Sequence, residues 1–228
     1  MPDISRSDGY RYGRGKGEAG VQVVQGFLRT ELDVPTDEIT GREDNYRSGD
    51  LRAPSGQTLE VKRQDIDPRR YPQNFIEVFE LTSGANPDHA AGFQTLAQLL
   101  DLGTDRLSQV TVHDRRARAR GPLGEPPAVS VSIQSIVGSS FTAYVNPGTR
   151  GPAHLYLYDV AEIVAYIRRV APRGFDRGLG RANNDTCSVF VPLAANRWSA
   201  ETDGPWVYTG DRDEAIEVAR IRGELLGA

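Results

Sequence analysis

Cysteine is nearly absent from this chain: its 228 residues include only Cys187. A single cysteine excludes an internal disulfide framework and a zinc site built from several cysteines. Long apolar runs are also missing, since no stretch approaches the ~20 residues that span a bilayer and no apolar signal segment opens the sequence. These absences predict a cytoplasmic protein that folds without disulfides and has no membrane partner.

Lysine is the second scarce residue. Of 27 basic residues only Lys16 and Lys62 are lysines, and 31 acidic residues bring the formal net charge to −4. This balance argues against wholesale wrapping of nucleic acid but permits local basic patches. Because the chain uses arginine wherever charge alone is needed, each lysine can mark a place that requires a compact ammonium group.

The first half of the chain predicts the element order α-β-β-β-α-β. Residues 1–16 are rich in Gly, Arg and Tyr without periodicity, which predicts a flexible basic arm. Apolar residues at three- and four-residue intervals then predict a helix over 17–32. Strand and helix patterns follow over 47–53, 58–64, 74–81, about 86–101 and 107–113.

After a basic linker the pattern changes. Alternating residues predict a hairpin made of 129–137 and 140–145, joined at Gly138-Ser139. The remaining elements are a strand, a helix capped by Asp159 and Glu162, a second strand and a final helix, over 154–158, 159–170, 187–191 and about 212–226.

Two acids and one of the two lysines fall on the hairpin predicted from strands 47–53 and 58–64. Glu60 and Lys62 share a face because they lie two residues apart on one strand, and the partner strand can bring Asp50 beside them. Two carboxylates can hold Mg²⁺, and a neighbouring ammonium can orient a water, as metal-assisted phosphodiester cleavage requires. The alternative is an exposed hairpin whose ion pair contributes little to stability. An acid two places before a lysine arises by chance in roughly one such sequence in four.

The segment SGDLRAPSGQTLEVKRQ resembles the catalytic hairpin of the PD-(D/E)xK nuclease superfamily, whose common core is also α-β-β-β-α-β. The resemblance covers about residues 17–115 and implies an α/β restriction-endonuclease-like core, with a central mixed sheet flanked by helices. Residues 116–228 would be a C-terminal α/β extension of the same globular domain. It further implies that Asp50 and Glu60 bind Mg²⁺ and that Lys62 assists the attacking water. The sequence departs from the family at Gly49, where proline is usual.

Three accessory residues join this hypothesis. Many members of the superfamily carry an acid on the first core helix, which makes Glu18 a candidate, although a glutamate in a first helical turn also favours the helix dipole. Gln64 continues the Glu60/Lys62 face, where a solvated strand end is the alternative. Glu77 falls in the strand expected next to the hairpin, with an ion pair to arginine as its other explanation.

Three arginine-bearing groups are candidates for holding DNA, and each has a solvated loop as its alternative. They are Arg11, Arg14 and Lys16 on the arm; Arg115, Arg116, Arg118 and Arg120 in the linker; and Arg173, Arg177, Arg181, Asn183 and Asn184 in the loop before the strand 187–191.

The other titratable residues carry little chemistry. His89, His113 and His154 lack metal-ligand spacing, and Cys187 opens an apolar strand, which is typical of a buried small side chain. The GRGKG run at residues 13–17 is too short for a phosphate loop and lacks its Ser or Thr, so no nucleotide cofactor is expected.

These observations predict a Mg²⁺-dependent endodeoxyribonuclease acting on double-stranded DNA, specifically a Type II restriction endonuclease working as a homodimer, with the helix 160–170 as a candidate interface. A junction-resolving or repair nuclease, a phage nuclease, and a DNA-binding module without catalysis remain the alternatives.

Overall fold

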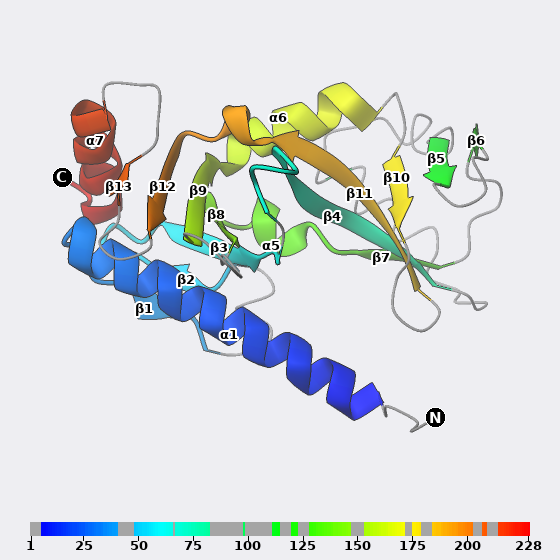
Figure 1. Ribbon diagram of the computed structural model, residues 1–228, viewed down its shortest axis with the longest axis horizontal. Helices are drawn as coiled ribbons and strands as arrows, with labels where there is room; N and C mark the ends of the chain where they lie inside the picture. Colours follow the sequence, from blue (N-terminus) through cyan, green and yellow to red (C-terminus); the bar gives the residue numbers. More distant parts are fainter. Residues whose placement is uncertain are drawn as a thin grey trace. The chain divides into compact units, whose positions relative to one another are not determined.

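The computed structural model describes residues 6–40, 48–65, 67–82, 98, 111–114, 120–122, 128–146, 153–171, 175–178, 184–202, 207–208 and 214–228. The fold is mixed α/β (Figure 1). The chain divides into two compact units. Unit 1 comprises Met1–Pro72, Gly138–Asp159 and Leu193–Ala228, and unit 2 comprises Gln73–Val137 and Val160–Pro192. Unit 2 is therefore inserted into unit 1 in two segments.

Unit 1 is built on a seven-stranded mixed sheet in the order β1-β2-β3-β8-β9-β12-β13. All neighbouring strands are antiparallel except β3 and β8, which run parallel. A parallel pair needs a long crossover connection, and the first segment of unit 2 lies within it. The strands are β1 (Asp37–Glu38), β2 (Leu51–Arg52), β3 (Thr58–Arg63), β8 (Phe141–Asn146), β9 (Ala153–Asp159), β12 (Trp198–Thr202) and β13 (Val207–Tyr208).

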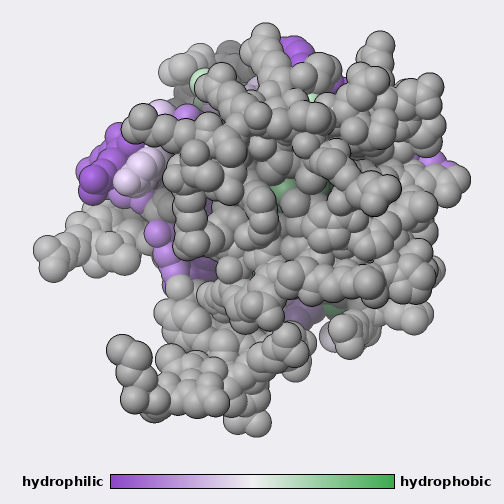
Figure 2. Space-filling view, turned by 90° about the vertical axis from the view of Figure 1, so that its right-hand side faces the viewer, coloured by the Kyte–Doolittle hydropathy of each residue, from purple (hydrophilic) through white to green (hydrophobic). Residues whose placement is uncertain are grey.

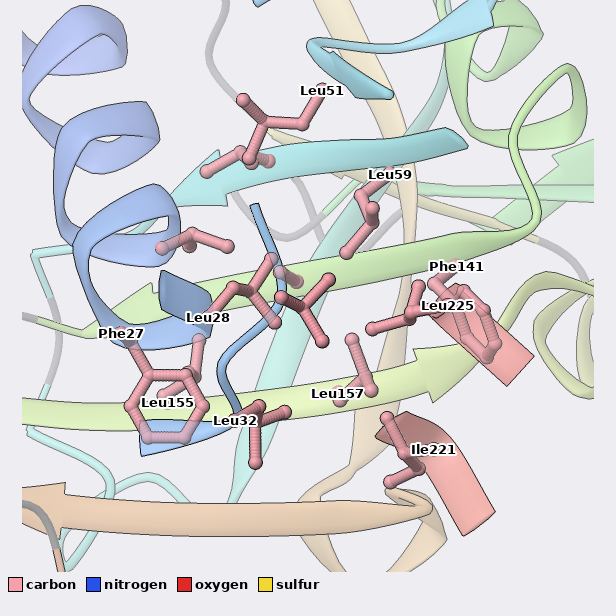
Figure 3. Close-up of a cluster of buried hydrophobic side chains, with 14 of the residues drawn as sticks. Phe27, Leu28, Leu32, Leu51, Leu59, Phe141, Leu155, Leu157, Ile221 and Leu225 are labelled. Carbon is pink, nitrogen blue, oxygen red and sulfur yellow. The ribbon is translucent and has the colours of Figure 1, made fainter. Parts of the chain in front are cut away.

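Helices α1 (Arg6–Glu31) and α7 (Glu214–Leu226) contribute to the hydrophobic core of unit 1. The stripe predicted for the first helix is buried, because Val21, Val24, Leu28 and Leu32 are each at most 8% exposed. Figure 3 shows side chains of α1 and α7 meeting those of β3, β8 and β9. At Gly20 a Cβ would lie 3.2 Å from the Cβ of Arg63, so glycine permits a close approach of α1 to β3.

Unit 2 contains a six-stranded sheet in the order β6-β5-β10-β11-β4-β7. The pair of β11 with β4 is the longest antiparallel ladder of the described residues. On α6, Tyr166 donates a hydrogen bond of 2.9 Å from its hydroxyl to the carbonyl of Phe190. The elements are β4 (Gln73–Thr82), β5 (Thr111–Asp114), β6 (Arg120–Pro122), β7 (Ala128–Val131), α5 (Gln134–Val137), α6 (Val160–Val170), β10 (Phe175–Gly178) and β11 (Asn184–Pro192).

Several expected elements are confirmed. Strands β3, β4, β9 and β11 and helices α6 and α7 lie within a few residues of their predicted positions, and Cys187 is fully buried. Helix α6 begins at Val160, directly after its predicted cap Asp159. Of the helix predicted over about 86–101, only residue 98 is described, as helical.

The predicted hairpin of 129–137 and 140–145 is wrong. Strand β7 pairs with β4 in unit 2, whereas β8 pairs with β3 and β9 in unit 1. Residues 134–137 form α5, and the amides of Ser132 and Ile133 both bond to the carbonyl of Val78. The local alternation is real, but it does not specify which sheet each strand joins.

Two further expectations are wrong. Residues 74–81 and 107–113 were expected to share a sheet with the hairpin, yet β4 and β5 belong to the sheet of unit 2. The arm was expected to be irregular, yet α1 already begins at Arg6. A helical segment without an apolar stripe gives no periodic signal, which is why its start was missed. The assignments of residues 17–115 and 116–228 stay predictions, and the two units do not separate at residue 116.

Large exposed hydrophobic side chains are few and scattered among the described residues: Val23, Tyr71 and Ile216. On the face shown in Figure 2, the coloured surface is mainly hydrophilic, with hydrophobic surface only in small areas. No helix in the described part of the chain combines the length and the apolar character needed to cross a membrane.

Candidate functional site

The three residues of the predicted catalytic set lie together on the hairpin of β2 and β3. Leu51 pairs with Leu59, and continuing this register places Asp50 across from Glu60. The backbone amide of Val61 donates a 2.7 Å hydrogen bond to Oδ2 of Asp50. The Asp50 carboxylate is therefore held against the residue that lies between Glu60 and Lys62.

Glu60 and Lys62 form an ion pair on one face of β3. Glu60 is buried, with 4% of its surface exposed, while 38% of the Lys62 side chain is exposed. Val61, between them, packs into the hydrophobic core on the opposite face. Burial of a carboxylate is costly unless a cation or hydrogen bonds compensate it, and Lys62 supplies a cation beside Glu60.

Gly49 gives Asp50 its approach to β3. Its φ angle is +85°, and a Cβ there would lie 2.7 Å from the carbonyl oxygen of Leu59 and would also meet Oγ of Ser139. Proline, with φ fixed near −65°, cannot adopt this conformation. Glycine at this position, where the superfamily that the hairpin resembles usually has proline, thus has a local cause.

We expect Gly49→Ala to lower the free energy of unfolding by at least about 2 kcal/mol, since it combines a strained φ with a backbone clash. The matched control is Gly26→Ala in α1, where no atom lies within 4 Å of the added Cβ, and a gain of about 0.5–1 kcal/mol is expected. Urea unfolding of both variants measures the difference. Equal stabilities would contradict the account of Gly49.

The neighbouring strand adds residues that the sequence did not reveal. Thr142 is the register partner of Glu60, and Tyr144 is the register partner of Lys62. Both are buried, at 0% and 1% exposure, and the Tyr144 ring meets the ring of Tyr158 edge-on at 5.7 Å. No local signal links β3 to β8, because about 80 residues separate them.

The polar face continues onto β9 and β12. His154 lies 3.4 Å from Glu201, measured from Nδ1 to Oε2, so the histidine interpreted as isolated has a carboxylate neighbour. Burial, with a smaller contribution from Glu201, raises the pKa of Tyr156 to about 12. Tyr156 therefore stays neutral throughout the physiological range.

The accessory candidates lie in different places. Glu18 is exposed on α1, two residues before the close approach of Gly20 to β3. Gln64 follows β3, and its backbone N–H donates a 2.9 Å hydrogen bond to the carbonyl of Val145. Glu77 lies on β4 in unit 2, so its expected position on a strand adjacent to the hairpin is wrong.

The expected DNA-binding groups are only partly described. Arg11, Arg14 and Lys16 lie on the amino-terminal half of α1. Arg120, Arg177 and Asn184 lie on β6, β10 and β11, in unit 2. The remaining candidates fall outside the described residues: Arg115, Arg116, Arg118, Arg173, Arg181 and Asn183.

Comparison with known proteins adds no family to these observations: no family model, curated protein or solved structure matches the chain. Across the described ranges, no group of three or more His, Cys, Asp and Glu side chains is arranged to hold a metal ion. The candidate donors at the hairpin are two carboxylates, from Asp50 and Glu60.

Proposed function

We propose that this chain is a Mg²⁺-dependent endodeoxyribonuclease that hydrolyses phosphodiester bonds of double-stranded DNA. The observation that carries the proposal is the convergence of Asp50 with the Glu60-Val61-Lys62 segment, through the hydrogen bond from the Val61 amide. Two carboxylates and an ammonium then lie at one point of a sheet. An exposed hairpin with an ordinary ion pair requires neither the burial of Glu60 nor a held Asp50.

The mixed sheet of unit 1 and the packing of helix α1 support a restriction-endonuclease-like core. Of the strands that the sequence predicted for this core, only β2 and β3 belong to the sheet. In unit 1, helix α1 is followed by β1, β2 and β3, and β8 follows the insertion; α5, which precedes β8 in the chain, ends the first segment of unit 2. Up to this point unit 1 has the order α-β-β-β-β, with these four strands adjacent in one mixed sheet. The acid-x-lysine motif then occupies the third strand, at the parallel pairing with the fourth.

The donor set fits Mg²⁺, which prefers oxygen ligands and retains several waters. Asp50 and Glu60 would hold the ion. An ionised carboxylate has about four acceptor sites, so the hydrogen bond from Val61 leaves Asp50 able to bind a cation. When bound, the ion stabilises charge on the phosphate and acidifies a water.

The residues of this chain have separate tasks. The Val61 amide fixes the direction of the Asp50 carboxylate. Lys62 carries its ammonium beside Glu60 at a partly exposed position, where it can donate to an attacking water. The buried side chains of Thr142 and Tyr144 form the adjacent part of the sheet and limit the space around this pair.

Within this class we propose a Type II restriction endonuclease that acts as a homodimer, since two subunits related by a two-fold axis can each cut one strand of a palindrome. Unit 2 carries the described members of the Arg- and Asn-rich group expected to read bases, Arg177 and Asn184.

Digestion of plasmid and genomic DNA with Mg²⁺, followed by sequencing of the ends, tests the proposal. Discrete fragments with one shared end sequence are expected, and excess chelator is expected to stop cleavage. The Asp50→Asn variant controls for a contaminating nuclease. Cuts placed by DNA structure would indicate a resolving nuclease, and binding without cleavage would indicate a binding module. Absence of both binding and cleavage would overturn the proposal.

A further inference from the structure

A short turn that follows β3 presents two arginines and a tyrosine at the surface. We call Asp67–Tyr71 the basic turn. Its Asp-Pro-Arg-Arg sequence has aspartate first and proline second, as type I turns favour. The amides of Arg70 and Tyr71 bond to the carbonyl of Asp67 at 3.1 and 2.9 Å. The Arg69 amide bonds to Oδ1 of Asp67 at 3.0 Å.

Hydrogen bonds attach both ends of this segment to unit 1. Before the turn, the backbone N–H of Gln64 donates a 2.9 Å hydrogen bond to the carbonyl of Val145. After it, the Leu193 amide bonds to the carbonyl of Pro72 at 3.0 Å, and Pro68 within the turn is buried. The basic turn is therefore a preorganised feature, which lowers the entropy lost when it binds a partner.

The two arginines of the basic turn are exposed cations. Arg69 and Arg70 are exposed, and within the described part of the chain no carboxylate lies within ion-pair distance of either. Nearby Arg63, by contrast, pairs with Asp65 at 3.2 Å. The Arg70 guanidinium lies 5.5 Å from the ring centre of Tyr71, a cation–π contact that orients it. Tyr71 itself is 52% exposed.

We propose that the basic turn binds backbone phosphates of the DNA substrate beside the cleavage position; this inference rests on the proposed function. Arg69 lies seven residues after Lys62, so the chain allows at most ~25 Å between their Cα atoms. One turn of B-DNA spans ~34–36 Å, and the contacted phosphates therefore fall within one turn of the scissile one. Arginine donates paired hydrogen bonds to phosphate. Such contacts fix the position of the duplex and carry no sequence information.

The test measures the salt dependence of DNA binding by the full chain, without divalent metal, on a duplex of random sequence about three helical turns long. Each lost phosphate contact reduces the slope of log K against log salt by about 0.9. The double variant Arg69→Gln/Arg70→Gln is thus expected to reduce the slope by about 1.8 and to weaken binding roughly tenfold or more near 0.1 M salt. Base preference at the mapped site is expected to stay unchanged.

Two controls make the result specific. Arg69→Lys/Arg70→Lys keeps both charges and is expected to retain most of the slope, whereas Arg29→Gln removes an exposed arginine of α1 and is expected to leave the slope unchanged. If the wild type binds DNA and the double Gln variant has the same slope of log K against log salt, this inference is overturned and the proposed function is not. A wild type that neither binds nor cuts DNA overturns the proposed function, and the inference with it.

Discussion

Lys62→Arg is expected to reduce the single-turnover cleavage rate at least ~100-fold while leaving the fold and DNA affinity unchanged. The substitution keeps the charge and can keep the ion pair to Glu60. A planar guanidinium, however, cannot place one donor where the ammonium stood. A displacement of ~1 Å in an active site can cost about a hundredfold in rate.

The same exchange at the other lysine is the control. Lys16 lies on α1, where the proposal assigns no catalytic task. The Lys16→Arg variant is therefore expected to cleave DNA at the wild-type rate. Single-turnover rates on one mapped substrate, with a thermal melt for each variant, settle the comparison. Wild-type cleavage by Lys62→Arg would mean that the hairpin carries a structural ion pair and that catalysis lies elsewhere.

The sequence predicted those parts of the site whose signals are local. Asp50, Glu60 and Lys62 lie within 13 residues, so a single hairpin brings them together and their spacing reveals it. Thr142 and Tyr144 come to lie beside Glu60 and Lys62 only through the parallel pairing of β3 and β8. That pairing depends on the closure of a long crossover, and no short-range pattern encodes it.

The elements of the fold were likewise easier to predict than their partners. Helix α6 was found from its capping residues and its apolar stripe, which act within one or two turns. The segment 74–81 and the first residues of 129–137 were recognised as β-type sequence. They were assigned to the wrong sheet or hairpin, because alternation gives the face of a strand and not its neighbour. Gly49 differs from the proline usual in the superfamily that the hairpin resembles, for a reason that only its φ angle reveals.

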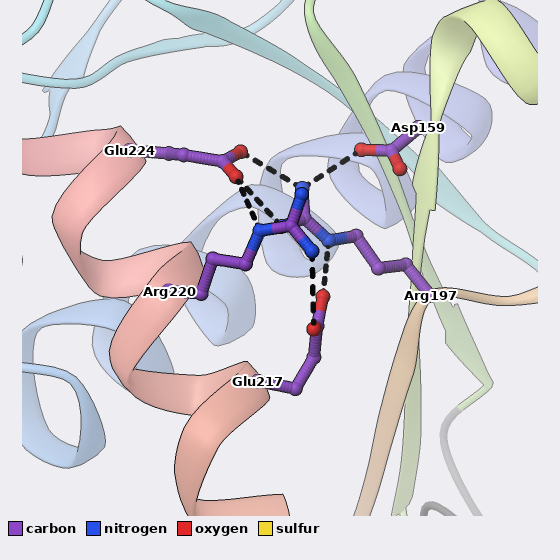
Figure 4. A network of polar contacts seen from close by, with 5 residues as sticks. All are labelled: Asp159, Arg197, Glu217, Arg220 and Glu224. Carbon is purple, nitrogen blue, oxygen red and sulfur yellow. Dashed lines mark hydrogen bonds and ion pairs between the residues drawn. The ribbon is translucent and has the colours of Figure 1, made fainter. Parts of the chain in front are cut away.

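Arg197 is a residue of a kind that sequence patterns cannot single out, because its partners are distant in the chain. Figure 4 shows its guanidinium surrounded by Asp159, Glu217 and Glu224. It donates to Glu217 at 2.5 Å, to Asp159 at 3.0 Å and to both oxygens of Glu224 at 2.8 Å. Only 7% of its side chain is exposed. These bonds connect α7 with the end of β9 and the start of β12.

Arg197→Met is expected to lower the free energy of unfolding by about 3–5 kcal/mol at neutral pH, because it leaves three converging carboxylates without their shared cation. The control is Arg220→Met in the same network. Arg220 is 67% exposed and lies 3.4 Å from Glu224, and loss of so exposed a pair is expected to cost at most about 1 kcal/mol. Urea unfolding of both variants gives the two values, and equal losses would contradict a central role for Arg197.

The pH dependence gives an independent check. The hydrogen bond from Arg197 holds the pKa of Glu224 below its usual value of 4.5. The stability that this bond contributes is therefore fully present above about pH 4.5 and is lost as the pH falls through the lowered pKa. In Arg197→Met this bond is absent, so the variant does not have this contribution to lose in acid. The difference in stability between wild type and variant is expected to stay the same at higher pH and to shrink as the pH falls below about 4.5. A difference that stays constant there would show that lost packing, and not charge, destabilises the variant.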